Sequence, residues 1–317
     1  MISLLRNIFS ILVMIDFVLG NFAYVFIALV NGIDWIKKQK ISFADQILTA
    51  LEISRIALLW ALVLYWCAVV FNPAFYSSGV RTIVHIAWVV SNHFSLSFGT
   101  SLSLLDLLKI ANFSSLFFLH LKWKARRVVL TILLGSLVFL VFHLAVASLD
   151  NKMQMNTYEG NLTWKTKLQD IVHLSNMTVF ILANFIPFTM SLTALLLLLF
   201  SLWKHLKKMQ LSGKGSQDAS TKVHVRAMQT VISFLLLFVI YFLVQISTVW
   251  NSYILKNNSV GIFFDVLGFL YPSSHSFILI WGNKKLRQVI LSFLWQLRSW
   301  LKERKKVGDH LSFGRKL

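Results

Sequence analysis

Seven apolar stretches dominate this sequence, and they constrain its fold more than any other feature. They cover residues 8–30, 47–70, 83–108, 128–149, 177–203, 228–253 and 261–281. A helix of about 20 mainly apolar residues crosses the hydrocarbon layer of a bilayer. Barrel strands are excluded because they alternate polar and apolar faces, which these runs do not. We therefore predict an all-α membrane protein, a seven-transmembrane helix bundle.

Composition agrees with lipid as the main solvent. The chain is 57% apolar and only 14% charged, whereas soluble proteins are about 25% charged. Its net charge of +19 comes in short basic bursts between apolar runs, which is the pattern of a membrane protein and disfavours a nucleic-acid partner. The single cysteine, Cys67, excludes an intrachain disulfide. The first apolar run exceeds a signal-peptide core in length, so we expect it to be a retained span.

The basic residues also predict the orientation of the bundle. They concentrate in the first, third and fifth connections and in the C-terminal tail. The positive-inside rule then places the N-terminus outside the cell and the C-terminus in the cytosol. We divide the chain into a bundle, residues 1–281, and a tail, residues 282–317. Within the tail an amphipathic helix with a basic polar face is expected to lie on anionic lipid of the inner leaflet; its apolar positions are Leu286, Val289, Ile290, Phe293, Leu294, Leu297 and Leu301.

Potential glycosylation sites are consistent with this orientation. Asn161, Asn176 and Asn257 each begin an N-x-S/T sequence on the predicted outer side. Asn161 is the strongest of the three because it lies in the middle of a loop, whereas Asn176 is close to the membrane. Asn112 begins a fourth such sequence on the inner side, where we expect it to be unused.

Polar residues inside the spans are candidates for function because burying them in lipid is costly. Arg55 lies deep in the second span, and Glu52 precedes it by one helical turn. Asn21 of the first span and Ser276 of the seventh can lie at a similar depth, and we predict that Arg55 is the hub of an internal polar network. Its fixed positive charge argues against a buried sodium ion there. Asp106 and Lys109, at the inner end of the third span, either pair with each other or form a switch toward a cytosolic partner.

A second group of candidates lies toward the outer surface. Trp88 and Asn92 share one face of the third span, with Tyr241 in the sixth span and Asp265 at the start of the seventh. Aromatic rings, an amide and a carboxylate suit an amphipathic, cationic ligand. The alternative is an ordinary interfacial belt of aromatic residues. No catalytic motif, cofactor loop or metal-ligand cluster appears in the sequence, so we expect neither an enzyme nor a cofactor or metal.

Several segments together resemble the type 2 bitter taste receptors, a family of seven-helix G-protein-coupled receptors. They are GNFAYVFIALVN, KISFADQILTALEISR, LLKIANFSSLFFLHLKWK, PFTMSL, HLKKMQLSGKGSQDASTKVHVRAMQTVI and HSFILIWGNKKLRQ, in that order along the whole chain. EGNLTW matches the family's glycosylation site at Asn161.

The resemblance implies a plasma-membrane receptor for bitter compounds that activates a gustducin-type heterotrimeric G protein, phospholipase C and calcium release. It assigns ligand binding to Trp88, Asn92, Tyr241 and Asp265. Close relatives tend to carry glutamate at the position of Asp265, an acid linked to binding the amine of alkaloids, and the aspartate here is one methylene shorter. A population shift between two states of the bundle is the expected mechanism.

The resemblance assigns activation and G-protein coupling to Arg55, Lys109, Lys222, His224, His275 and Ser276. The chain departs from the family where Leu105 and Asp106 replace Phe-Tyr, and where Glu52 replaces an alanine. The added acids either alter basal activity and coupling or simply pair with Lys109 and Arg55. Two other classes were considered: a vomeronasal type 1-like receptor, disfavoured by the HSFILI element, and a small transporter, disfavoured by the odd number of spans and the lack of a repeat.

Overall fold

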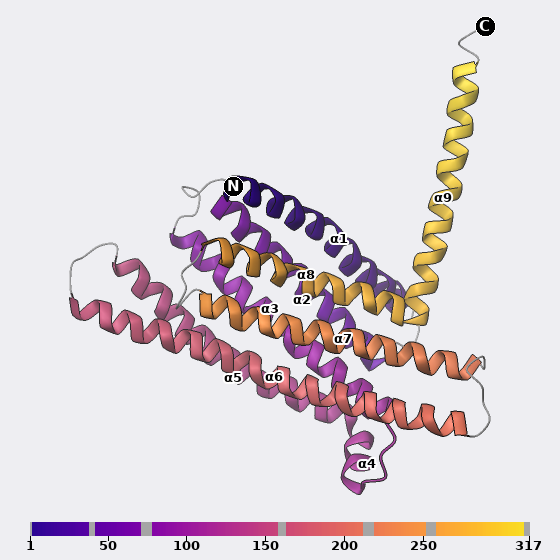
Figure 1. Cartoon of the computed structure of the whole chain (residues 1–317), viewed down its shortest axis with the longest axis horizontal. Helices are drawn as coiled ribbons and strands as arrows, with labels where there is room; N and C mark the ends of the chain where they lie inside the picture. Colours follow the sequence, from indigo (N-terminus) through magenta and orange to yellow (C-terminus); the bar gives the residue numbers. More distant parts are fainter. Residues whose placement is uncertain are drawn as a thin grey trace.

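The computed structural model describes residues 2–37, 42–70, 78–157, 163–211, 219–251 and 258–313. Within these residues the regular structure consists of nine helices. Long helices lie side by side in a bundle, the short α4 sits at one end, and α9 leaves the bundle crosswise (Figure 1). Their bounds are α1 Ile2–Ile36, α2 Phe43–Val70, α3 Ser78–Ile110, α4 Leu116–Trp123, α5 Ala125–Thr157, α6 Thr163–Leu211, α7 Ala219–Trp250, α8 Asn258–Gly282 and α9 Lys284–Phe313.

Six of the described helices, α1, α2, α5, α6, α7 and α8, are long and apolar enough to cross a membrane. The remaining long helix of the bundle, α3, packs against α2, α5 and α6. It carries many buried polar side chains: Ser91, Asn92, His93, Ser95, Ser97, Thr100 and Ser101. A helix enclosed by its neighbours can be more polar than one that faces lipid. The predicted seven-helix bundle is confirmed, with α3 as the enclosed helix that carries these buried polar side chains.

The outer faces of the bundle remain apolar. On α5, for example, Val138 is 71% and Leu134 is 65% exposed. Apolar surface this extensive is unfavourable in water, but it is the surface that a bilayer requires. The interior is filled by separate apolar clusters between neighbouring helices, such as the one that joins Tyr24 of α1, Leu59 and Trp66 of α2, and Val266 of α8.

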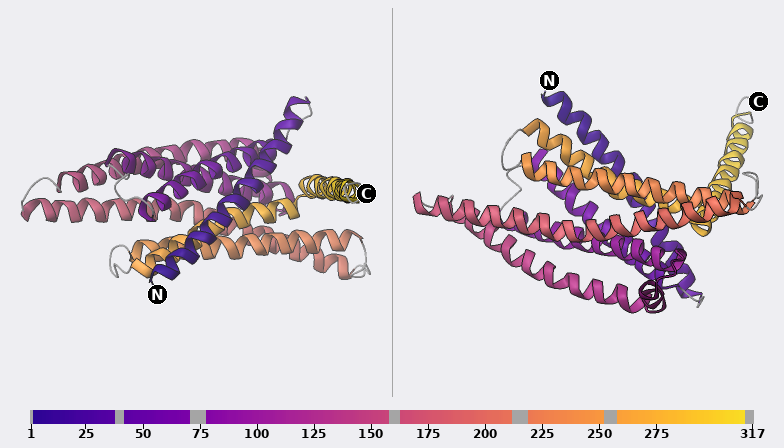
Figure 2. Two further views of the ribbon diagram at one scale, coloured as in Figure 1. Left: turned by 90° about the horizontal axis from the view of Figure 1, so that it is seen from above. Right: turned by 60° about the horizontal axis from the view of Figure 1, so that its bottom comes forward.

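Helix α6 is much longer than the apolar run that predicted it. Residues 177–203 were expected as a span, but the helix covers 49 residues, Thr163–Leu211. Hydropathy marks only the part of a helix inside the hydrocarbon, and the more polar flanks continue as helix beyond it. The two ends of the bundle can be followed in Figures 1 and 2. The N-terminal end holds the start of α1, and the C-terminal end holds α4 and the junction of α8 with α9.

The junction of α8 and α9 is packed against two other helices, α1 and α7. Asn283 caps α9, because its Oδ1 accepts hydrogen bonds from the backbone N–H groups of Lys285 (3.0 Å) and Leu286 (3.3 Å). Lys285 forms an ion pair with Asp34 of α1. A Cβ atom at Gly282 would lie 2.8 Å from the Cγ2 atom of Thr230, so only glycine allows α8 to approach α7 this closely. The predicted amphipathic helix is therefore present, and its first turn is firmly anchored.

Candidate functional site

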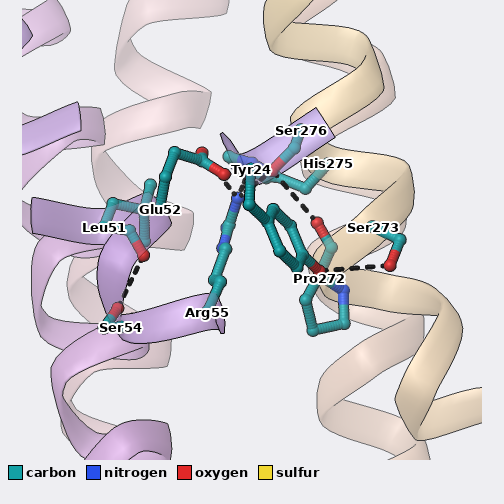
Figure 3. Close-up of polar contacts among 9 residues, drawn as sticks. All are labelled: Tyr24, Leu51, Glu52, Ser54, Arg55, Pro272, Ser273, His275 and Ser276. Carbon is teal, nitrogen blue, oxygen red and sulfur yellow. Dashed lines mark hydrogen bonds and ion pairs between the residues drawn. The ribbon is translucent and has the colours of Figure 1, made fainter. Parts of the chain in front are cut away.

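Four buried polar residues meet between α2 and α8, and we call them the polar centre. Glu52 and Arg55 lie one turn apart on α2, while His275 and Ser276 follow Pro272 on α8 (Figure 3). Arg55 is 1% exposed, and Glu52 and Ser276 are completely buried. Charged groups this deep are stable only when they are paired and hydrogen-bonded.

One nitrogen of Arg55 makes most of the contacts in the polar centre. Its Nη1 atom lies 3.3 Å from Glu52 Oε1 and donates to Ser276 Oγ at 2.8 Å. Ser276 in turn donates to Glu52 Oε2 at 2.9 Å, which closes a ring of three side chains. The pairing of Glu52 with Arg55 expected from sequence is therefore present. Ser276 links this pair to α8.

His275 completes the polar centre as an acceptor. Its Nδ1 atom lies 3.0 Å from Arg55 Nη1. Because a guanidinium group has only donors, Nδ1 must accept, and the imidazole is neutral with its proton on Nε2. A face of the imidazole ring stacks on the ring of Phe234 of α7, with 4.5 Å between the ring centroids. His275 thus connects the charged pair on α2 to α7.

A second hydrogen-bonded group lies next to the polar centre and ties α1 to α8. Ser273 Oγ donates to Asp16 Oδ2 at 3.2 Å and lies 3.1 Å from the hydroxyl of Tyr24. Asn21, which the sequence places at a similar depth, makes its hydrogen bond elsewhere. Its amide donates to the carbonyl of Phe17 in the same helix at 2.8 Å, so a local acceptor satisfies it. Asp16 was missed, although an acid inside the first apolar run is a signal that could have found it.

The outer candidate residues meet between α3, α6 and α7. Tyr241 donates from its hydroxyl to Asn92 Oδ1 at 2.8 Å, and Asn92 Nδ2 donates to Asn184 Oδ1 at 3.3 Å. Trp88, one turn from Asn92, stacks on Phe180 of α6 at 5.4 Å between ring centroids. Three of the four predicted ligand residues thus contact neighbouring helices at the same level of the bundle. Asn184, which sequence reasoning missed, joins them.

Aromatic stacking connects this outer group to the polar centre. The ring of Tyr241 stacks on Tyr271 of α8 at 4.2 Å between centroids, and Tyr271 lies 6.0 Å from the ring of His275. The same three rings line a cavity of about 20 Å³, which also borders Ser95 and Ser191. Small-molecule pockets usually hold about 300–1,000 Å³. In this conformation the outer residues are closed upon one another.

The remaining predicted activation residues lie away from the polar centre. Lys109 is exposed at the end of α3, and Lys222 is exposed in the first turns of α7. The expected ion pair between Asp106 and Lys109, both described residues, does not form within 4.0 Å. His224 is half-buried and stacks on His205 of α6. Leu105, a departure from the family pattern, is 1% exposed and packs against α2 and α5.

Some predicted sites fall outside the described part of the chain. They are Asn161, Asn257 and the side chain of Asp265. Asn176 is described, and it is buried within α6 with its Nδ2 donating to Asp150 Oδ2 at 2.8 Å. This position gives Asn176 a structural role, so Asn161 remains the main glycosylation prediction. Asn112 Oδ1 accepts a hydrogen bond from Lys122 at 2.8 Å.

A bundle of membrane-length helices joined by buried polar links defines a multi-pass membrane protein. Comparison with known proteins identifies the class. The family profile described as "Taste receptor protein (TAS2R)" matches residues 1–298. The chain is 59% identical to "Taste receptor type 2 member 46" of Homo sapiens over 305 residues, which are 96% of this chain and 99% of that protein.

Other relatives agree. The chain is 58% identical to "Taste receptor type 2 member 31" of Pongo pygmaeus, again over 96% of this chain and 99% of that protein. It is 59% identical to "Putative taste receptor type 2 member 33" of Homo sapiens over the same shares. The chain therefore belongs to the taste receptor type 2 family and is a multi-pass, G-protein-coupled bitter taste receptor. The vomeronasal and transporter alternatives are excluded.

Proposed function

We propose that this receptor binds bitter agonists between α3, α6 and α7 at the outer, N-terminal end of the bundle, and that binding activates a gustducin-type G protein at the cytosolic end. Phospholipase C and calcium release follow. The N-terminus is extracellular, the C-terminus is cytosolic and the receptor acts in the plasma membrane. Excess Lys and Arg in the cytosolic connections and tail support this orientation.

The observation that carries the proposal is a continuous series of contacts from the outer residues to the polar centre. It runs from Asn92 through the hydroxyl and ring of Tyr241 to Tyr271, His275 and Arg55. An agonist that takes over the hydrogen bond between Tyr241 and Asn92 changes the position of Tyr241 and hence of α7. The agonist must favour the open arrangement energetically, because a ligand shifts an equilibrium only by its differential affinity.

Cationic alkaloids are the ligand class that the outer residues favour. Trp88 offers an aromatic face, and Asn92 and Tyr241 offer hydrogen-bonding groups. Asp265, in the first turns of α8, supplies the carboxylate for an amine. These groups together suit a molecule that is apolar over most of its surface with one positive charge.

The cytosolic end of the bundle supplies the G-protein contact. Lys109, Lys222 and His224 lie on the end turns of α3 and α7, where a partner can reach them. Movement of α7 relative to α6 and α3 changes how these three residues are presented. Beyond them, α9 extends crosswise to the bundle, which is the direction of the membrane plane (Figure 1). Its apolar stripe and basic face suit binding to anionic lipid of the inner leaflet.

The deciding experiment is a calcium assay in cells that express the receptor with a gustducin-like chimeric G protein. We expect transients with at least one cationic bitter alkaloid, and silence across a broad panel despite surface expression would refute the assignment. Asp265→Asn should reduce responses to cationic agonists more than to neutral ones. Equal losses would exclude a role for the charge.

The orientation is tested separately by glycosylation. Asn161→Gln should lower the apparent mass on a gel, whereas Asn112→Gln should leave it unchanged. A shift with Asn112→Gln would reverse the topology.

A further inference from the structure

Two histidines from different helices meet at the cytosolic end of the bundle. His205 lies in the last two turns of α6 and His224 in the second turn of α7. Their ring centroids are 4.5 Å apart, with an angle of 37° between the ring planes. His205 is exposed and His224 is half-buried, so the pair is open to solvent on one side.

We propose that His205 and His224 form a two-imidazole binding site for a divalent transition-metal ion such as Cu²⁺ or Zn²⁺. Neutral imidazole is the commonest protein ligand of these ions. Metal–nitrogen bonds of about 2.0–2.1 Å require the two donor nitrogens to lie roughly 3–4 Å apart. Rings whose centroids are 4.5 Å apart reach that separation by rotation about their side-chain torsions. Water fills the remaining coordination positions.

The chemistry of the surroundings sets the strength of this site. No group of three or more His, Cys, Asp or Glu that could hold a metal occurs among the described residues, so these two rings act without a third protein ligand. The nearest basic residues along the chain are Lys204, Lys207, Lys222 and Arg226. Their repulsion of a cation is screened in water, whereas coordination by an imidazole lone pair acts at short range. The site therefore binds metal more weakly than a structural zinc site with four protein ligands.

Metal at this position would hold α6 and α7 together. The two helices are packed neighbours, and His205 and His224 bridge them near their cytosolic ends. An ion that needs both rings binds only while they are close, so it stabilises that arrangement by its binding free energy. This part of the inference rests on the proposed function, in which α7 moves relative to α6 during activation. The bound ion then acts as an inhibitor that opposes the agonist.

Binding is tested without any agonist. The full-length receptor in lipid nanodiscs is titrated with Cu²⁺ and followed by electron paramagnetic resonance. The wild type should show coordination by two imidazole nitrogens. His205→Gln and His224→Gln should each lose that signal and weaken binding by more than about tenfold, since even outer-shell losses cost about 10–100-fold in metal affinity. His120→Gln, which removes an exposed histidine on α4, is the matched control and should bind like the wild type.

Equal Cu²⁺ affinity and an unchanged spectrum in the wild type and His224→Gln would overturn the site. The inhibitory effect is measured next, as agonist-driven nucleotide exchange on the G protein with and without Cu²⁺. Inhibition of the wild type that is absent in His205→Gln and reversed by a chelator supports this inhibitory role of the ion. Bound copper without inhibition overturns it. A receptor that drives no exchange even without metal contradicts the proposed function, while the spectroscopic result for the site stands.

Discussion

Two buried links between helices differ in charge, and the difference separates what holds this receptor together from what a ligand can displace. The polar centre joins α2 to α8 because a charged pair on α2, buried from water, hydrogen-bonds to Ser276 and His275 of α8. The outer contact joins α3 to α7 through one hydrogen bond between neutral groups, Tyr241 and Asn92. Breaking a buried ion pair costs about 3–5 kcal/mol, whereas a neutral hydrogen bond contributes about 0.5–1.5 kcal/mol. Under the proposed function, an agonist replaces the second link but not the first.

The largest effect is expected when the charged link is broken on one side. Arg55→Met leaves the buried Glu52 carboxylate without its positively charged partner and should destabilise the receptor by about 3–5 kcal/mol. Surface expression and the thermal unfolding temperature in detergent measure the loss. Adding Glu52→Gln to Arg55→Met removes the stranded charge and should restore much of the stability. A double variant no more stable than Arg55→Met would show that the charge is not the cause.

A smaller loss of stability is expected where Gly20 of α1 packs against Ser273 of α8. A Cβ atom at Gly20 would lie 2.5 Å from Ser273 Oγ and 3.1 Å from Leu59 Cδ2. Gly20→Ala should therefore displace Ser273 from Tyr24 and Asp16 and cost about 1–3 kcal/mol, as overpacking does. Gly32→Ala is the control on the same helix, because nothing lies within 4 Å of the added atom. If both variants unfold at the same temperature, the close approach at Gly20 is unimportant.

Breaking the neutral hydrogen bond between Tyr241 and Asn92 should destabilise the receptor less than breaking the charged pair. Tyr241→Phe removes the hydroxyl that donates to Asn92, and Asn92 keeps its contact with Asn184. We expect a loss of about 0.5–1.5 kcal/mol in stability and a raised basal signal in the calcium assay, since the resting arrangement is weakened. A thermal loss as large as that of Arg55→Met would remove the distinction between the two links.

The smallest effect is expected at the base of α9. Lys285 is 40% and Asp34 is 23% exposed, so their ion pair is partly screened. Lys285→Ala should cost less than about 1 kcal/mol, with a further small loss from its 3.2 Å contact with Asn31. Its effect should appear as greater mobility of a spin label on α9. Lys284→Ala, at an exposed neighbouring position, is the control and should leave the label unchanged.

Much of this architecture could be predicted from sequence because the bilayer imposes strong rules. The lengths of the apolar runs predicted the spans. The similar depth of Arg55 in the second span and Ser276 in the seventh correctly predicted that these two residues lie close together. Depth does not reveal which acceptor a side chain will choose. Asn21 donates to a carbonyl in its own helix, while Tyr24, at nearly the same depth, hydrogen-bonds to Ser273 of α8. The acid at position 106 did not pair with Lys109, because spacing permits an ion pair without requiring one.

The outer group shows another limit of sequence reasoning. Residue types predicted an aromatic and amide-lined site, but they did not reveal that Asn92 and Tyr241 bind each other in the closed bundle. Hydrogen bonds between groups 149 residues apart depend on helix rotation, which one sequence does not specify. Asn184 was missed for the same reason.

The length of α6 has a mechanical consequence. At 1.5 Å per residue its 49 residues extend about 74 Å, more than twice the roughly 30 Å of hydrocarbon. Pro187 lies near the middle of the helix, and its carbonyl accepts a hydrogen bond from Thr100 of α3 at 3.2 Å. A rod supported at its centre acts as a lever. A tilt of a few degrees about that support displaces both ends by several ångströms in opposite directions, so a small adjustment near the middle of the helix becomes a larger displacement at its ends.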